Sequence, residues 1–341
     1  SIEDAKTKEV VGSWTFTMPD SGNAGITFGP HNASPSPDGK YVAIGFADKV
    51  TATGETRNLT LLINLRTAKI AKILRHPAQR YHHGSSFTDS KGNQRWYLTY
   101  GFGSAGSPSV LLDKDLRVVK TIDNEFLGQH MGHPYPTVSP DGKFLWASIE
   151  ATYIKEEADR TAAMAKINLE NDAIVLVPGV GNHPIGQKHT VDGAFTYVND
   201  GDGSRVYKID NKTNKVVDAT SAGVAGPYGN VLNWDESELY MVGKGEGSHN
   251  KGGGWGLIDT KVFRQSRGFE SQPFLMTTDP ITGLQTGSAS SLDHSILNPD
   301  PTTNELWGSN MNGWEIIIFD LTTHKVTKFI TVPNGGDTHS G

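Results

Sequence analysis

Histidine recurs at one position of a sequence repeat, just before a short apolar segment and a tight turn. The clearest copies read HNASPSPDGKYVAIGFAD, HPYPTVSPDGKFLWASIE and HSILNPDPTTNELWGSN. The histidines at this position are His31, His83, His133, His189, His294 and His339. Imidazole is a ligand for copper, zinc, iron and nickel. Histidines at equivalent places in a repeat therefore predict a metal centre, provided that the fold brings them together.

The elements that carry these histidines are predicted to be short antiparallel strands. Alternating apolar residues bounded by Asp, Asn, Gly and Pro are typical of strands joined by tight turns. A second unit follows each histidine unit, as in LTLLINLRTAKIAKIL and RVYKIDNKTNKVVDAT, so that each repeat supplies four strands. Tyr228 takes the histidine position in YGNVLNWDESELYMVG, and only KEEADRTAAMA resembles a helix.

Sheets of four strands that recur along the chain favour a β-propeller over a β-sandwich. We predict an all-β, seven-bladed β-propeller of four-stranded antiparallel blades, as a single domain over residues 1–341. The segment AKTKEVVGSWTFTMP resembles the last strand of a blade, and THSG resembles the start of another. The seventh blade is therefore expected to pair the N-terminal strand with C-terminal strands, and to be incomplete in this chain.

In a propeller, the first strand of each blade lines the central channel, so residues that begin these strands converge at one mouth. The second strand runs back to the same mouth, which would bring Glu150 close to His133. The loop GKGEGSHNKGGG would add His249, with Lys244 nearby, and Asp48, Asp200 and Asn310 would lie near the rim. Strand alternation predicts that His82 and His83 point to opposite sides.

Each of these residues also has a plainer interpretation. A buried histidine is more often hydrogen-bonded within a core than bound to metal, and polar propeller channels also hold water alone. Glu150 is as readily a salt-bridge partner at a strand end as a general acid or base. His76 and His324 are expected to be surface residues. His82, His130 and His183 neighbour the repeat histidines and are candidates to bind a metal or to support its ligands.

Composition narrows the chemistry further. The net charge of −6 gives no basic footprint for nucleic acid or an anionic membrane, and no apolar run is long enough to span a bilayer. Cysteine is absent, which removes disulfides and thiolate ligands. The histidines outnumber the ligands that one tetrahedral ion needs, so a cluster of two or three copper ions is the leading prediction. Calcium at the acidic turns is the alternative.

The histidines that open repeats, together with GGDTHSG and SLDHSILNP, resemble those of the thiocyanate dehydrogenases, which are periplasmic copper propellers. More distantly they are similar to the propeller domain of nitrous oxide reductase. The resemblance implies copper ligands at His31, His83, His189, His294 and His339, with His133 or His249 as a further ligand, and Glu150 as the active-site carboxylate. The chain is shorter than such proteins, and a catalytic lysine expected near the N-terminus has no match.

The implied reaction is oxidation of a small anion, thiocyanate, to cyanate and sulfur, with an external electron acceptor such as a cytochrome. The implied location is the periplasm, after removal of a signal peptide, and a homodimer is left open. Two other functions stay open: a calcium-dependent hydrolase or lactonase, and a propeller that binds a partner without catalysis.

Overall fold

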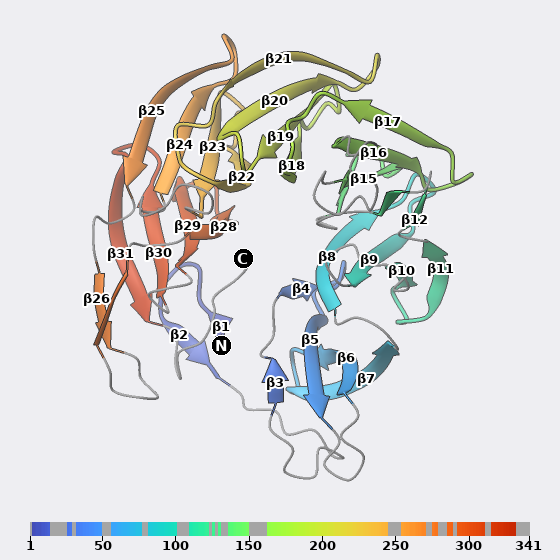
Figure 1. The fold of residues 1–341 in the computed structure, drawn as a ribbon. Helices are drawn as coiled ribbons and strands as arrows, with labels where there is room; N and C mark the ends of the chain where they lie inside the picture. Colours follow the sequence, from blue (N-terminus) through green and yellow to red (C-terminus); the bar gives the residue numbers. More distant parts are fainter. Residues whose placement is uncertain are drawn as a thin grey trace. The chain divides into compact units, whose positions relative to one another are not determined.

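In the computed structural model, the described part of the chain is built of short strands (Figure 1). The described residues are 2–13, 26–28, 32–49, 56–76, 81–100, 109–122, 125–126, 129–130, 136–149, 162–244, 254–270, 275–278, 285–288, 292–310 and 315–331. They pack into two compact units. One holds residues 15–179 and 191–193, and the other holds residues 1–14, 180–190 and 194–341. Each unit contains three large antiparallel sheets.

The unit of residues 15–179 contains the first, second and third sheets. The first sheet comprises β3 (Ile26–Phe28), β4 (Ala33–Pro35), β5 (Tyr41–Lys49), β6 (Thr56–Asn64) and β7 (Lys69–His76). The second and third sheets comprise β8 (Tyr81–Thr88), β9 (Gln94–Tyr100), β10 (Ser109–Asp113) and β11 (Val118–Ile122), and β14 (Thr137–Val138), β15 (Phe144–Ile149), β16 (Ala163–Asn168) and β17 (Ile174–Pro178). The hairpin β12 (Glu125–Phe126) and β13 (Gln129–His130) stands between them in sequence.

In the first sheet, β3 and β4 both pair with β5 and together take the place of a single first strand. The second and third sheets have four strands in sequence order. The arrangement of two hairpins per repeat, predicted from the sequence, is therefore confirmed in these sheets.

The other unit contains the fourth, fifth and sixth sheets, each of four strands in sequence order. The fourth and fifth comprise β18 (Pro184–His189), β19 (Phe195–Asp200), β20 (Arg205–Asp210) and β21 (Lys215–Ser221), and β22 (Pro227–Leu232), β23 (Glu238–Gly243), β24 (Gly254–Asp259) and β25 (Arg264–Glu270). The sixth comprises β28 (Leu292–Leu297), β29 (Glu305–Asn310), β30 (Glu315–Asp320) and β31 (Lys325–Thr331). Two further hairpins are β1 (Ile2–Glu3) with β2 (Val10–Gly12), and β26 (Leu275–Thr278) with β27 (Gln285–Ser288).

The Ser-Pro-Asp-Gly turns of the first and third sheets are built in the same way. Ser36 Oγ donates to Asp38, and Ser139 Oγ donates to Asp141, at 2.8 and 2.6 Å. Gly39 and Gly142 end the turns at φ angles of +66° and +69°, which glycine adopts without strain. The sequence repeat is therefore a repeat of turn chemistry as well as of strand pattern.

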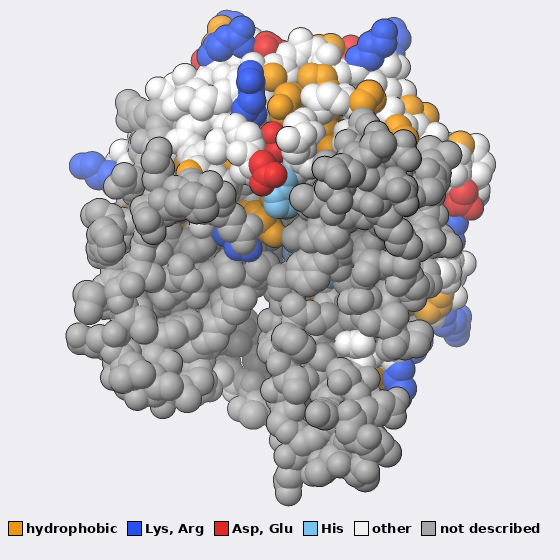
Figure 2. Space-filling model, viewed as in Figure 1, with side chains coloured by type: hydrophobic (Ala, Val, Ile, Leu, Met, Phe, Trp, Pro, Cys, Tyr) orange, Lys and Arg blue, Asp and Glu red, His pale blue; other side chains and the backbone are white. Residues whose placement is uncertain are grey.

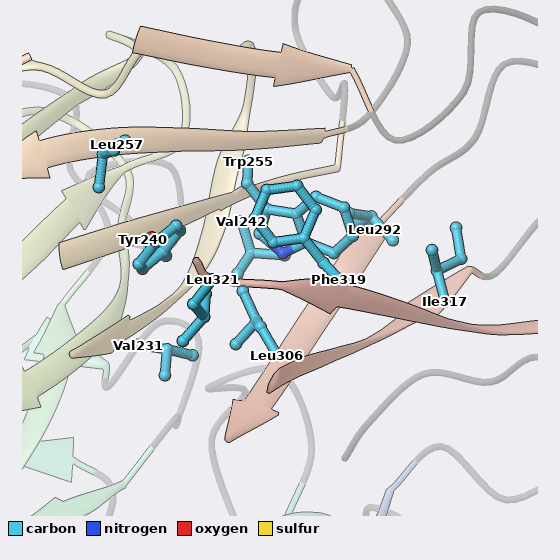
Figure 3. Packing of buried hydrophobic residues seen from close by; sticks show 10 residues of the cluster. All are labelled: Val231, Tyr240, Val242, Trp255, Leu257, Leu292, Leu306, Ile317, Phe319 and Leu321. Carbon is cyan, nitrogen blue, oxygen red and sulfur yellow. The ribbon is translucent and has the colours of Figure 1, made fainter. Parts of the chain in front are cut away.

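Large aromatic side chains join neighbouring sheets within each unit. In the core between the fifth and sixth sheets, the rings of Trp255 on β24 and Phe319 on β30 lie 4.7 Å apart between centroids (Figure 3). Leu292 and Leu306 of the sixth sheet pack in the same cluster (Figure 3). In the other unit, Tyr81, Trp96 and Tyr100 are fully buried. Burial of these faces stabilises the sheets by packing them against one another.

Six sheets of the predicted kind are present in the described residues, where seven blades were predicted. The N-terminal strand was predicted to pair with C-terminal strands. Instead, β2 pairs with β1. A side chain joins the two ends instead: Lys328 Nζ on β31 donates to the Lys8 carbonyl oxygen at 2.6 Å. The last residues, 332–341, lie outside the described residues.

The helix-like segment KEEADRTAAMA ends in a strand, because Ala163–Asn168 forms β16. The rest of that segment lies outside the described residues, apart from Ala162. Among the residues that the structure describes, no helix is long and apolar enough to cross a membrane.

Candidate functional site

Three of the seven predicted metal ligands lie in the described part of the chain: His83, His189 and His294. Their side chains are all buried. The predicted ligands His31, His133, His249 and His339, and the predicted catalytic Glu150, lie outside the described residues. The candidate site is therefore built from the three described histidines and the side chains that position them.

His83 and His294 occupy the same place in their two sheets. In β8, Tyr81 pairs with Tyr100 and Gly84 pairs with Leu98, so that residues 82 and 83 together face Thr99. In β28, Leu292 pairs with Asn310 and Ser295 pairs with Gly308, so that residues 293 and 294 together face Ser309. Two residues opposite one is a β-bulge, which re-aims the side chains that it carries. The prediction that His83 and His294 lie near the start of a first strand is confirmed.

A hydroxyl side chain holds each histidine backbone in its bulge. Thr99 Oγ1 accepts from the N–H of His83 and donates to its carbonyl oxygen, both at 3.1 Å. Ser309 Oγ accepts from the N–H of His294 at 3.4 Å and donates to its carbonyl oxygen at 3.3 Å. We call each such bridge a hydroxyl clip. It satisfies backbone groups that the bulge removes from the strand ladder.

The bulge also corrects the prediction for His82 and His83. Their ring centroids lie 4.2 Å apart in an edge-to-face arrangement, so the two rings are neighbours and do not point to opposite sides of the sheet. The prediction was wrong because strand alternation holds only in a regular ladder, and the bulge interrupts it here.

Two sets of hydrogen bonds connect the first and second sheets, and the one through Asn32 reaches His83. Trp96 Nε1 donates to Ser34 Oγ at 3.1 Å, and the Tyr81 hydroxyl donates to Asn32 Oδ1 at 3.1 Å. Asn32 Nδ2 then lies 2.9 Å from His83 Nδ1 and donates to it, which leaves the ring proton on Nε2. Burial raises the pKa of the Tyr81 hydroxyl, so Tyr81 remains a donor.

His189 is placed differently from the prediction. It is the last residue of β18, beside the turn to β19, and not the first residue of a strand. The residues that face Asn199 in the fourth sheet are Ile185 and Gly186, because Pro184 pairs with Asp200 and Gln187 with Val198. Gly186 therefore stands where His83 and His294 stand in their sheets. A Cβ atom at Gly186 would lie 2.3 Å from the Tyr228 carbonyl oxygen, so no histidine fits there.

His189 has its own hydrogen-bonded support. The Thr196 hydroxyl donates to Asn211 Oδ1 at 2.7 Å, and His189 Nδ1 lies 2.8 Å from the same hydroxyl oxygen. Since the hydroxyl proton is used by Asn211, His189 Nδ1 carries the proton and Nε2 carries the lone pair. This is one of the two tautomers in which histidine can bind a metal. His189 lies at the opposite end of the first strand from the bulge.

Around His294, side chains of the fifth sheet add a positive charge. The Tyr228 ring meets the His294 ring edge-on at 6.1 Å between centroids. Lys244 Nζ lies 4.1 Å from the centroid of the same tyrosine ring, a cation–π contact. Tyr228 was expected at the histidine position of its repeat, and it does lie at the irregular start of β22. These contacts lie within one unit and connect the Lys244 ammonium to His294 through the Tyr228 ring.

Glu315 is a carboxylate that the sequence repeats did not indicate. It pairs on β30 with Asn310, which pairs with Leu292 at the start of β28. Burial raises the pKa of Glu315, although a hydrogen bond with Asn310 opposes the shift. Its Oε2 atom is buried and has no hydrogen-bond partner among the described residues. The one signal in the sequence was its place shortly after the strand end at Asn310.

The donor types suit copper, with one condition on the His83 tautomer. No group of three or more His, Cys, Asp or Glu side chains that could hold a metal ion occurs among the described residues. His83 and His294 supply imidazole, which copper accepts, whereas His189 lies at the other end of its strand and does not share their position. His83 would bind through Nε2 only if the Asn32 amide turned over, so that Oδ1 accepted a proton from Nδ1.

Comparison with known proteins defines the fold. No protein-family model matches the sequence, and no curated protein matches it. The β-propeller domain of Cps50 (Swd1) from Myceliophteria thermophila is one of the solved structures that are similar to this chain. It superposes with a TM-score of 0.61 at 13% identity, over 93% of this chain and 91% of that one. The fold is a β-propeller. The antiparallel sheets are its blades, and at this identity the likeness concerns the fold alone.

Proposed function

We propose that this propeller holds copper through the histidines that open its first strands, and that it oxidises a small anion such as thiocyanate. The observation that carries the proposal is the equivalence of His83 and His294. Two blades that are far apart in sequence place a buried imidazole in the same bulge, with the same hydroxyl clip.

The histidines are not needed to build the bulge. In the fourth blade the same bulge forms with Ile185 and Gly186 opposite Asn199. If the bulge were needed only for the fold, apolar residues or glycine would be enough to form it, as in the fourth blade. Imidazoles at this position in the second and sixth blades therefore favour a role in binding, and the predicted ligands outside the described residues belong to the same proposal.

Copper, when bound, would accept two electrons and polarise the bound anion. The chain would supply the rest: the Lys244 ammonium would attract the anion, the hydroxyl clips would fix the backbone of His83 and His294, and Glu150 would take a proton from the attacking water. In the balanced reaction, thiocyanate and water give cyanate, elemental sulfur, two protons and two electrons. The electrons would pass to an external acceptor such as a periplasmic cytochrome.

The test is turnover of thiocyanate by the full chain, loaded with copper, with an artificial one-electron acceptor. We expect cyanate to form together with two equivalents of reduced acceptor. His294→Gln should lower kcat by about a hundredfold, since loss of a ligand's support alone costs about 10–100-fold. His324→Asn is the matched control, because His324 lies at a turn with φ +54° that asparagine also adopts.

Equal turnover in the wild type and His294→Gln would contradict the proposal. Turnover that requires calcium and no electron acceptor would favour a hydrolase. Absence of turnover for both proteins, with no copper bound, would favour a propeller that only binds a partner.

A further inference from the structure

A pocket lies in the unit of residues 15–179, at the turns between the second and third blades. Its volume is about 320 Å³. Its apolar part is formed by Phe87, Leu111, Val119 and Leu169. A pocket of this size with an apolar wall and a few polar groups is typical of small-molecule sites. None of the predicted metal ligands lines it.

Basic side chains outnumber acidic ones in the lining of the pocket, although the whole chain carries a net charge of −6. Four basic side chains and two acidic ones line it: Lys91, Arg95, Lys120 and Lys143, with Asp89 and Glu170. Figure 2 shows lysine and arginine side chains at several separate places on the face in view. Each of the four basic side chains that line the pocket is paired with a carboxylate: Lys91 with Glu170, Arg95 with Asp89, Lys120 with Asp172 and Lys143 with Asp141. An anion would therefore be held by the donor groups that these pairs leave over, and not by an excess of charge.

Arg95 is the best-placed anion receptor in the pocket. Its Nε donates to Asp89 Oδ2 at 2.9 Å, and both side chains are about four-fifths buried. Asp89 is itself held by the N–H groups of Lys91 and Asn93, at 3.0 and 2.8 Å. Among the described residues this pairing uses only Nε of the guanidinium. The two terminal amino groups remain for a bidentate contact with an oxyanion.

Hydrogen bonds favour the ionised form of the Asp89 carboxylate, which this arrangement requires. Burial would raise the pKa of Asp89, but hydrogen bonds from Asn93, Arg95 and Lys91 outweigh burial and lower the pKa. The turn is also closely packed, because Gly142 of the third blade lies against it. A Cβ atom at Gly142 would lie 2.2 Å from the Thr88 carbonyl oxygen. The guanidinium is thus fixed before any ligand arrives, which lowers the entropic cost of binding.

The geometry points to a binding site for a small organic oxyanion, in which Arg95 holds a carboxylate or phosphate head and the apolar wall with Val119 covers the ligand body. This inference is independent of copper and of the histidines, and it adds a second ligand site to the propeller. The head group is either a carboxylate or a phosphate, and the experiment separates the two.

The test is titration of the full chain with benzoate, phenyl phosphate and the neutral benzamide, followed by calorimetry or NMR. Ligands of this size bind with dissociation constants of about 1 mM when a single ion pair anchors them. We expect one or both anions to bind and benzamide to bind at least tenfold more weakly. The preferred anion then identifies the head group.

Two pairs of variants assign binding to this pocket. Arg95→Gln should weaken anion binding tenfold or more, whereas Arg264→Gln should not, although Arg264 also pairs with an aspartate on the surface. Val119→Glu should abolish binding, whereas Val118→Glu should not. The neighbours Val118 and Val119 are 48% and 46% exposed, and only Val119 lines the pocket.

Val118→Glu and Val119→Glu add the same charge to the same strand. A loss of protein stability common to both variants can therefore be told apart from a loss of binding in Val119→Glu alone. The inference is overturned if neither anion binds at ten times the expected dissociation constant. It is equally overturned if Arg95→Gln and Val119→Glu bind as tightly as the wild type, or if benzamide binds as well as the anions.

Discussion

At the scale of the residue, the hydroxyl clips are the least replaceable part of the candidate site. Thr99 and Ser309 each serve both backbone groups of a histidine, so one oxygen satisfies two groups that the strand ladder leaves unpaired. A buried backbone N–H without an acceptor costs about 1–3 kcal/mol. The clip therefore fixes the imidazole and contributes to folding at the same time.

Thr99→Val is expected to lower the free energy of unfolding by about 1–3 kcal/mol, because the isosteric methyl group cannot bond to His83. Thr99→Ser keeps the hydroxyl and should cost less. Urea denaturation of the three proteins measures the difference. Equal stability of Thr99→Val and Thr99→Ser would show that the clip contributes nothing.

The raised pKa of Glu315 predicts how the stability of the protein changes with pH. Since the folded-state pKa lies above the unfolded one, the ionised carboxylate destabilises the fold at higher pH, and the penalty disappears as pH falls below the unfolded value. Glu315→Gln should therefore raise Tm at pH 8 and leave it unchanged near pH 4. A Tm gain that is as large at pH 4 as at pH 8 would exclude burial of the charge as its cause.

At the scale of the element, the sequence predicts strands and turns better than it predicts bulges. Alternating apolar residues and Pro-Asp-Gly turns locate β4 with β5 and β14 with β15, because both signals are local. A bulge adds one residue to one strand, and its position depends on the partner strand. The sequence pattern of the fourth blade therefore predicted the wrong place for His189. His189 stands one residue before the turn residue Thr190, whereas His294 stands four residues before Asn298. The shorter spacing to the turn was the sequence signal that His189 lies at the end of its strand and not at the start.

Gly186 gives the corresponding prediction for the fourth blade. Gly186→Ala would press a methyl group against the Tyr228 carbonyl oxygen, and should cost about 1–3 kcal/mol or more, as overpacking does. Gly39→Asn is the control, because no atom lies within 4 Å of a Cβ there and asparagine tolerates its φ of +66°. Thermal unfolding should separate the two variants, and a Gly186→Ala protein as stable as Gly39→Asn would contradict the close packing of β18 on β22.

At the scale of the whole molecule, propeller and blade type follow from the sequence repeat, but blade number does not. Six blades are present among the described residues, and the N-terminal strand that suggested a seventh pairs within its own hairpin. A strand pattern predicts that a segment can join a sheet, but it does not predict which strand the segment pairs with. The histidine centre is likewise predicted only in part, because convergence depends on blades whose histidines lie outside the described residues.

Sheet-to-sheet packing predicts which core residues carry stability. Phe319→Ala should cost about 3–5 kcal/mol, because Phe319 is 2% exposed between the fifth and sixth blades. Phe329→Ala on the adjoining β31 should cost far less, since Phe329 is 40% exposed. Guanidinium denaturation compares them, and similar losses of stability would contradict a core shared between the two blades.

The central claim, that histidines from separate blades hold copper, is tested most directly by the copper content of the full chain after copper loading and removal of free metal. The account predicts at least one tightly held ion per chain, with nitrogen ligands in the electron paramagnetic resonance spectrum. His83→Ala and His294→Ala should each lower that content, while His324→Asn should not. Less than one ion per chain in the wild type, or the same content in all four proteins, would contradict it.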